Sequence, residues 1–236
     1  MAYLPLLVLL LQVLLNRFIL YIYFLQAISL RNYKNEEFWN VLTHFSGFIM
    51  SLIGIPFLFH FDNEFTVLST LSIILFSFGL LAVYSTSTLY HFTLKSELKK
   101  RFKVLDHISI YYLILGSYAP VCLITLYDYS GIGIFIAVLI LSIIGTIKKL
   151  FFTGKYEFIS VLLYLAMGWL IIFDINSLFR LIDSNAELLL ILGGVSYTIG
   201  VIFYAFSSIK YFHSIWHLFV LAGSTLHFFM ILFYVI

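Results

Sequence analysis

Residues 213–235 read HSIWHLFVLAGSTLHFFMILFYV and contain no Asp, Glu, Lys or Arg. A helix needs about 20 mostly apolar residues to cross the hydrocarbon core of a bilayer, so this stretch is long enough to span a membrane. It begins with His213 and His217, whose spacing places them on one helix face, about 6 Å apart along the axis. Two imidazoles at this spacing can bind one metal ion. Ionisable groups at the edge of a membrane-buried helix usually serve a function.

Six further apolar windows precede this stretch, near residues 39–60, 66–90, 104–127, 130–147, 158–175 and 187–208. Charged residues make up 10% of the chain, whereas soluble domains contain about 25%. Lipid offers the backbone no hydrogen-bond partners, so spanning segments must be helices or strands of closed barrels. No window shows the alternation of a barrel strand. The sequence therefore predicts an all-α integral membrane protein, a seven-transmembrane helix bundle with short connections.

An additional apolar stretch, residues 3–26, precedes the seven windows and contains Asn16 and Arg17. It lacks the positively charged start and the small-residue cleavage site of a secretory signal. We expect an extra N-terminal hydrophobic helix, which either spans the membrane or lies at the interface with Arg17 reaching the headgroups. The chain thus divides into an N-terminal apolar segment with a basic linker, residues 1–35, and a seven-helix membrane domain, residues 36–236.

The positive charges lie almost entirely on one side of the predicted bundle. Eleven of the thirteen Lys and Arg residues fall before the first of the seven windows or in every second connection: Arg31, Lys34, Lys95, Lys99, Lys100, Arg101, Lys103, Lys148, Lys149, Lys155 and Lys210. Cytoplasmic loops carry the excess of Lys and Arg. We therefore expect a multi-pass membrane protein whose seven-helix core starts inside and ends outside. The same rule explains the basic run at 95–103 without nucleic-acid binding.

This topology brings polar residues from three helices to one depth, near the cytoplasmic leaflet. The second window ends there with His91, the third begins there with Asp106, and the seventh begins with His213 and His217. Three neutral imidazoles with one open position are typical of catalytic zinc sites, and zinc activates water and polarises carbonyl groups. The three histidines are thus candidate ligands, and Asp106 is a candidate to orient or deprotonate the water. Because membrane histidines also form hydrogen bonds between helices, the residues alone leave both interpretations open.

Other polar residues could support such a site. Ser87 lies one helical turn before His91, where its hydroxyl could hydrogen-bond an imidazole, a water or an oxyanion. His44, early in the first window, and His107 are candidates for supporting contacts, although His107 points about 100° away from Asp106. His227 lies 14 residues beyond His213, about 21 Å further along the helix axis, which is too far to share the metal.

Several motifs resemble signatures of the haemolysin III and adiponectin-receptor-related (progestin and adipoQ receptor) family. They are SxxYH (Ser87, Tyr90, His91), DHxxIYxxxxGSYxP (Asp106, His107, Tyr111, Gly116, Ser117, Tyr118, Pro120), HxxxHxFVxxGSxxH (His213, His217, Phe219, Val220, Gly223, Ser224, His227) and NxxTHxxG (Asn40, Thr43, His44, Gly47). The individual motifs are short, but their order and spacing are specific. The resemblance covers about residues 36–236 and looks closest to the bacterial haemolysin III branch, which implies a protein of the bacterial inner (cell) membrane. Residues 3–26 depart from the family pattern.

The resemblance implies a zinc ion near the cytoplasmic leaflet, with His91, His213 and His217 as ligands. Asp106 would hold the water, and Ser87 would stand beside the ligands. Tyr111, in the second motif, joins His44 and His107 as a candidate for supporting contacts. The wider superfamily includes alkaline ceramidases, which implies metal-dependent hydrolysis of lipid amides, and the haemolysin name implies membrane lysis.

Three function classes follow from these observations. The first is a zinc-dependent hydrolase of lipid amide or ester bonds, with a membrane lipid as its substrate. The second is a non-enzymatic lytic, pore-forming or receptor-like protein with a structural zinc. Few polar stripes run along the windows, which disfavours a wide pore formed by one chain. An ion or metal transporter ranks third, because the polar residues cluster at one depth and do not follow a path. The oligomeric state stays open.

Overall fold

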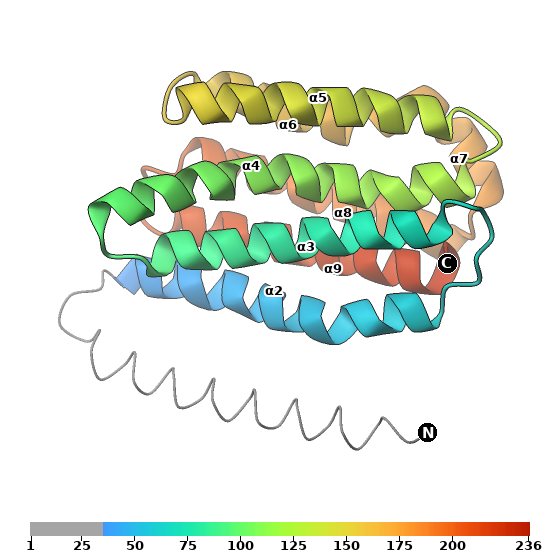
Figure 1. Ribbon diagram of the computed structural model, residues 1–236, viewed down its shortest axis with the longest axis horizontal. Coiled ribbons are helices and arrows are strands. Elements are labelled where there is room, and N and C mark those ends of the chain that lie inside the picture. Colours follow the sequence, from blue (N-terminus) through green and yellow to red (C-terminus); the bar gives the residue numbers. More distant parts are fainter. Residues whose placement is uncertain (1–34) are drawn as a thin grey trace, which may run out of the picture.

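The computed structural model describes residues 35–236, which form helices joined by short connections (Figure 1). The apolar stretch at 3–26 lies outside the described residues. The elements are α2 (Asn35–His60), α3 (Ser69–Phe92), α4 (Ser96–Pro120) with a π-helical turn (Val121–Thr125), α5 (Gly131–Phe152), α6 (Glu157–Gly168), a 3-10 turn (Leu170–Asp174), α7 (Ile175–Leu181), α8 (Ser184–Ala205) and α9 (Phe212–Tyr234).

Seven segments of the described chain are long and apolar enough to cross a membrane. They coincide with the seven predicted windows, so the all-α, seven-helix prediction is confirmed. The third segment differs most, because its helix begins at Ser96 and not near residue 104. Residues 96–103 carry five charges and therefore fall outside an apolar window, yet they continue the same helix beyond the apolar region.

The fifth segment is not one straight helix, because α6 ends at Gly168 and gives way to the 3-10 turn and α7. The Tyr118 hydroxyl of α4 donates to the Gly168 carbonyl at 2.9 Å and accepts from the Ile171 amide at 3.0 Å. Backbone groups that a helix break releases inside a membrane need such partners. Tyr118 therefore allows this segment to bend within the bundle.

Two glycines bring α3 and α4 close together. A Cβ atom at Gly79 would lie 2.6 Å from the Tyr112 carbonyl oxygen, and one at Gly116 would lie 2.7 Å from the Leu75 carbonyl oxygen. Small residues allow membrane helices to approach this closely. α2 packs against α3 and α9, and α3 packs against α4. The start of α2, the end of α3 and the starts of α4 and α9 lie at one end of the bundle (Figure 1).

Candidate metal centre

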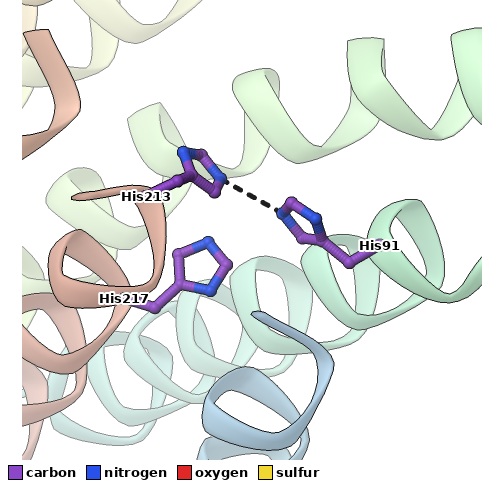
Figure 2. Close-up of side chains that lie close together, drawn as sticks. All are labelled: His91, His213 and His217. Carbon is purple, nitrogen blue, oxygen red and sulfur yellow. Dashed lines mark hydrogen bonds between the residues drawn. The ribbon is translucent and has the colours of Figure 1, made fainter. Parts of the chain in front are cut away.

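Three histidines from two helices converge at this end of the bundle. His91 lies in the last turn of α3, and His213 and His217 lie in the first turns of α9. One ring nitrogen of each lies within 4.8 Å of those of the other two. Figure 2 shows the three rings turned toward one another, with Nε2 of His213 3.1 Å from Nε2 of His91. The two windows that the sequence placed at one depth therefore meet side by side.

A carboxylate of α2 fixes the orientation of His91. Nδ1 of His91 lies 2.6 Å from Oε2 of Glu37, and Oε1 of Glu37 accepts a hydrogen bond from Nζ of Lys99 at 2.7 Å. With its Nδ1–H group donated to Glu37, His91 presents the lone pair of Nε2 to the cluster. Glu37 thus links α2 with the ends of α3 and α4.

The backbone and side chains of α2 orient His217 in the same way. Nδ1 of His217 lies 3.2 Å from the Asn40 carbonyl oxygen and 3.2 Å from Oγ1 of Thr43. The side-chain oxygen of Asn40 also accepts a hydrogen bond from Oγ of Ser214 at 2.5 Å, which ties α9 to α2. His44 of α2 stacks on His217 with ring centroids 3.6 Å apart, and both residues line the cavity described below.

The donor set fits a zinc ion. Zinc–nitrogen bonds of about 2.0 Å in tetrahedral geometry place two ligand nitrogens roughly 3.3 Å apart, close to the 3.1 Å between the His91 and His213 nitrogens. His91 and His217 each engage Nδ1 elsewhere, which leaves Nε2 for a metal. Three imidazoles without a thiolate or carboxylate suit zinc and leave one position open. Among residues 35–236, these three form the cluster that could hold a metal ion.

Asp106 and Ser87 lie beside the cluster and not within it. Asp106 is buried in α4 and lines the same cavity as His213 and His217. Ser87 lies close enough to Asp106 for the two side chains to interact, although its enclosed Oγ makes no hydrogen bond of ordinary geometry with a described residue. The Asp106 carboxylate therefore faces the space where a water or a substrate would meet the three imidazoles.

A cavity of about 420 Å³ extends from His213 and His217 into the bundle. Most of its wall comes from α4, α6, the 3-10 turn, α7, α8 and α9, with single residues from α2, α3 and the π-helical turn, and most of the lining side chains are apolar. Val220 and Met230 mark its course along α9 away from His217. The rings of His213 and His217 therefore border a largely apolar space inside the bundle.

The structure separates the remaining candidates. His107 lines the cavity beside Asp106. His227 also lines the cavity, further along α9, where its Nε2 lies 3.4 Å from the Leu190 carbonyl oxygen. Tyr111 is fully buried against Tyr164, with ring centroids 4.6 Å apart, and it is not part of the cavity wall.

Sequence reasoning assigned no role to Glu37, Asn40 or Thr43. These residues lie three positions apart, so α2 presents them on one face, at the same end of the bundle as His91. The available signal was this spacing, together with the place of Asn40 and Thr43 in the NxxTHxxG motif. The stretch did not reveal which histidines these residues would contact, because the contacts depend on how α2 packs against α3 and α9.

Comparisons with known proteins agree with this architecture. The family described as "Haemolysin-III related" matches residues 32–228. The chain is 37% identical to Hemolysin-3 of Bacillus cereus over 205 residues, which cover 86% of this chain and 94% of that protein. It is 36% identical to a Hemolysin-3 homolog of Bacillus subtilis over 84% of this chain and 94% of the relative. The human monocyte to macrophage differentiation factor is 27% identical over 83% of each chain. The chain therefore belongs to the haemolysin-III-related family and is a multi-pass integral membrane protein.

Proposed function

We propose that this protein is a zinc-dependent membrane hydrolase that cleaves an amide or ester bond of a lipid. The observation that carries the proposal is the direct connection between the three-histidine cluster and the apolar cavity. A structural metal site would not need an adjoining space of this size. The open fourth position and the buried carboxylate of Asp106 at the cavity wall also favour chemistry over a purely structural role.

In this proposal the cavity binds the acyl chain and excludes water from it, so that the scissile carbonyl group comes to rest at the histidines. A zinc ion held by His91, His213 and His217 would supply Lewis-acid chemistry at that carbonyl group and activate a water. Asp106 would hold the attacking water by a hydrogen bond, accept its proton and return it to the leaving amine or alcohol as the bond to the acyl carbon breaks. Ser87, next to Asp106, is placed to donate a hydrogen bond to the carboxylate or to the developing oxyanion.

We also propose that the protein resides in the bacterial inner (cell) membrane, with the metal centre on the cytoplasmic side. The connections between α3 and α4, α5 and α6, and α8 and α9 lie at one end of the bundle (Figure 1), and together with the flanking ends of α4 and α5 they carry most of the Lys and Arg residues. Cys122 is buried, so introduced cysteines can report orientation. An impermeant thiol reagent should label Asp62→Cys in intact cells and Lys95→Cys only after permeabilisation. The opposite pattern would reverse the proposed orientation.

The experiment that tests the hydrolase is a lipid panel. Purified wild-type protein is incubated with ceramides, N-acylethanolamines and glycerol esters, and released fatty acid is measured by mass spectrometry. We expect release from at least one class, loss of release with a chelator, and recovery with added zinc. Asp106→Asn should retain the metal but lose release. A zinc-loaded protein that cleaves no lipid of the panel would contradict the proposal.

A second candidate function is membrane lysis, because two relatives carry the name Hemolysin-3. Leakage of a dye from liposomes separates the two. If the wild type and the His213→Ala/His217→Ala double variant cause equal leakage, lysis is independent of the metal centre. If leakage disappears in the double variant and follows fatty-acid release in time, lysis is a consequence of lipid hydrolysis.

A further inference from the structure

A second group of ionisable side chains lies beside the metal centre, between α4, α5 and α6. Lys149, in the last turn of α5, has a fully enclosed side chain. Its Nζ lies 2.5 Å from Oε2 of Glu157, at the start of α6, and 3.0 Å from Nδ1 of His107, in α4. The proposed reaction uses none of these three residues. A buried lysine is costly in a membrane and calls for an explanation beyond topology.

The contacts of Lys149 determine which nitrogen of His107 carries the proton. The Glu157 carboxylate favours the ammonium form of Lys149, and an ammonium group can only donate. Nδ1 of His107 must therefore accept from Nζ, and in a neutral imidazole the proton then resides on Nε2. The Tyr164 hydroxyl donates to the His107 carbonyl at 2.8 Å and holds this part of α4 in place. His107 consequently presents one N–H donor in a fixed orientation.

This donor belongs to the wall of the main cavity. His107 lines the cavity together with Asp106, Tyr204 and His213. Within residues 35–236 no group accepts a hydrogen bond from Nε2 of His107. This nitrogen is also not fully enclosed by protein atoms, so part of its surface is accessible. Its accessible surface therefore faces the cavity. An N–H donor that faces an apolar space gains free energy when an acceptor enters that space.

We propose that the Nε2–H group of His107 donates a hydrogen bond to an oxygen atom of a lipid in the cavity, and that Lys149 and Glu157 are positioning residues that hold this donor. Because His107 follows Asp106 in α4, the oxygen belongs to the polar end of the lipid and not to its tail. The Asp106 carboxylate on the same wall disfavours an anion, so the acceptor is a neutral hydroxyl or carbonyl oxygen. The inference rests on the proposed function only in that a lipid occupies the cavity; it requires neither zinc nor hydrolysis.

The chain offers a reporter for this subsite. Its three tryptophans are Trp39, Trp169 and Trp216. Trp216 is 7% exposed, lines the cavity and contacts Tyr204, with ring centroids 5.4 Å apart. A Trp39→Phe/Trp169→Phe background leaves Trp216 as the only tryptophan, and bromine atoms on a bound lipid quench its fluorescence. The full-length protein is kept in chelator, and two probes are titrated: a dibrominated octadecyl alcohol and the matching dibrominated octadecane.

In this background His107→Leu should weaken binding of the alcohol about 5- to 10-fold, the loss expected for one hydrogen bond, and leave binding of the alkane unchanged. His107→Gln, which restores an N–H donor, should recover most of the alcohol affinity. His60→Leu, at the exposed end of α2, is the matched control and should alter neither probe. Equal loss of both probes, unchanged alcohol binding, or no quenching by either probe would overturn the proposal. A protein that cleaves no lipid but discriminates between the probes would refute the hydrolase alone.

A second measurement leaves His107 in place, so it does not depend on whether a His107 variant folds. In protein labelled with ¹⁵N-histidine and kept in chelator, His107 should show the tautomer protonated at Nε2. Lys149→Met should shift it toward the tautomer protonated at Nδ1, whereas Lys148→Met should not. Protonation of His107 at Nδ1 in the wild-type protein would overturn the proposal.

Discussion

Glu37 accepts the Nδ1 proton of His91 at 2.6 Å, across the interface between α2 and α3. This contact makes the candidate metal centre a three-helix structure, although its candidate ligands come from two helices. Histidines that bind metals commonly donate their other N–H group to a carboxylate, which fixes the ring and makes the ligand nitrogen more basic. We therefore expect Glu37→Gln to weaken zinc binding about 10- to 100-fold, as measured by competition with a chromophoric chelator.

Glu36→Gln is the matched control for this prediction, because Glu36 is the neighbouring acidic residue in the first turn of α2 and lies outside the three-histidine cluster. Its zinc affinity should equal that of the wild type. If both variants bind zinc as tightly as the wild type does, Glu37 has no part in holding His91 for a metal.

Asp106→Asn separates metal binding from chemistry. Asp106 lies outside the three-ligand cluster, so the variant should keep its zinc content. Loss of a positioned general base lowers a rate about 10²- to 10⁴-fold, and fatty-acid release measured by mass spectrometry should fall by that factor. Loss of zinc from Asp106→Asn would instead make the carboxylate a metal ligand.

The cavity predicts a dependence on chain length. Gly194 lines the cavity, and a Cβ atom there would meet nothing within 4 Å, so Gly194→Phe should place its ring inside the cavity. We expect slower hydrolysis of long-chain substrates and little change for short-chain ones. Gly133→Phe, in α5, is the matched control. A Cβ atom at Gly133 would also meet nothing within 4 Å, but Gly133 is not part of the cavity wall. Equal effects of the two substitutions on long-chain turnover would argue against binding of the chain in this cavity.

The close approach of α3 and α4 predicts a stability effect. Gly116→Ala would push its Cβ against the α3 backbone at Leu75, and overpacking of this kind costs about 1–3 kcal/mol. Thermal unfolding in detergent should show a lower midpoint for Gly116→Ala than for Gly133→Ala, which has open space around its Cβ. Identical midpoints would mean that the two helices can separate without loss of stability.

The sequence was sufficient to predict the seven-helix architecture, because each spanning segment can be recognised from its length and apolar composition. The start of α4 at Ser96 and the break after Gly168 were not predictable in this way. Charged residues can extend a helix into water without an apolar signal. The break depends on Tyr118, which is 50 residues away in the sequence from Gly168 and satisfies its carbonyl group.

The same contrast holds at the metal centre. Charge asymmetry placed His91 and His213 at one depth, and the structure brings their nitrogens to 3.1 Å. The family motif made Tyr111 a candidate for supporting contacts, whereas in the structure it packs against Tyr164. Lys149 counted as a positive charge for topology, whereas its side chain is enclosed against Glu157 and His107. Such pairings depend on helix packing, which spacing within one helix does not reveal.

The central claim is that His91, His213 and His217 hold a zinc ion. The most direct test is the metal content of purified protein, measured by inductively coupled plasma mass spectrometry for the wild type, His213→Ala and His60→Ala. We predict about one zinc per chain in the wild type and in His60→Ala, and loss of zinc in His213→Ala. Absence of zinc from the wild type after incubation with the metal, or full retention in His213→Ala, would contradict the account.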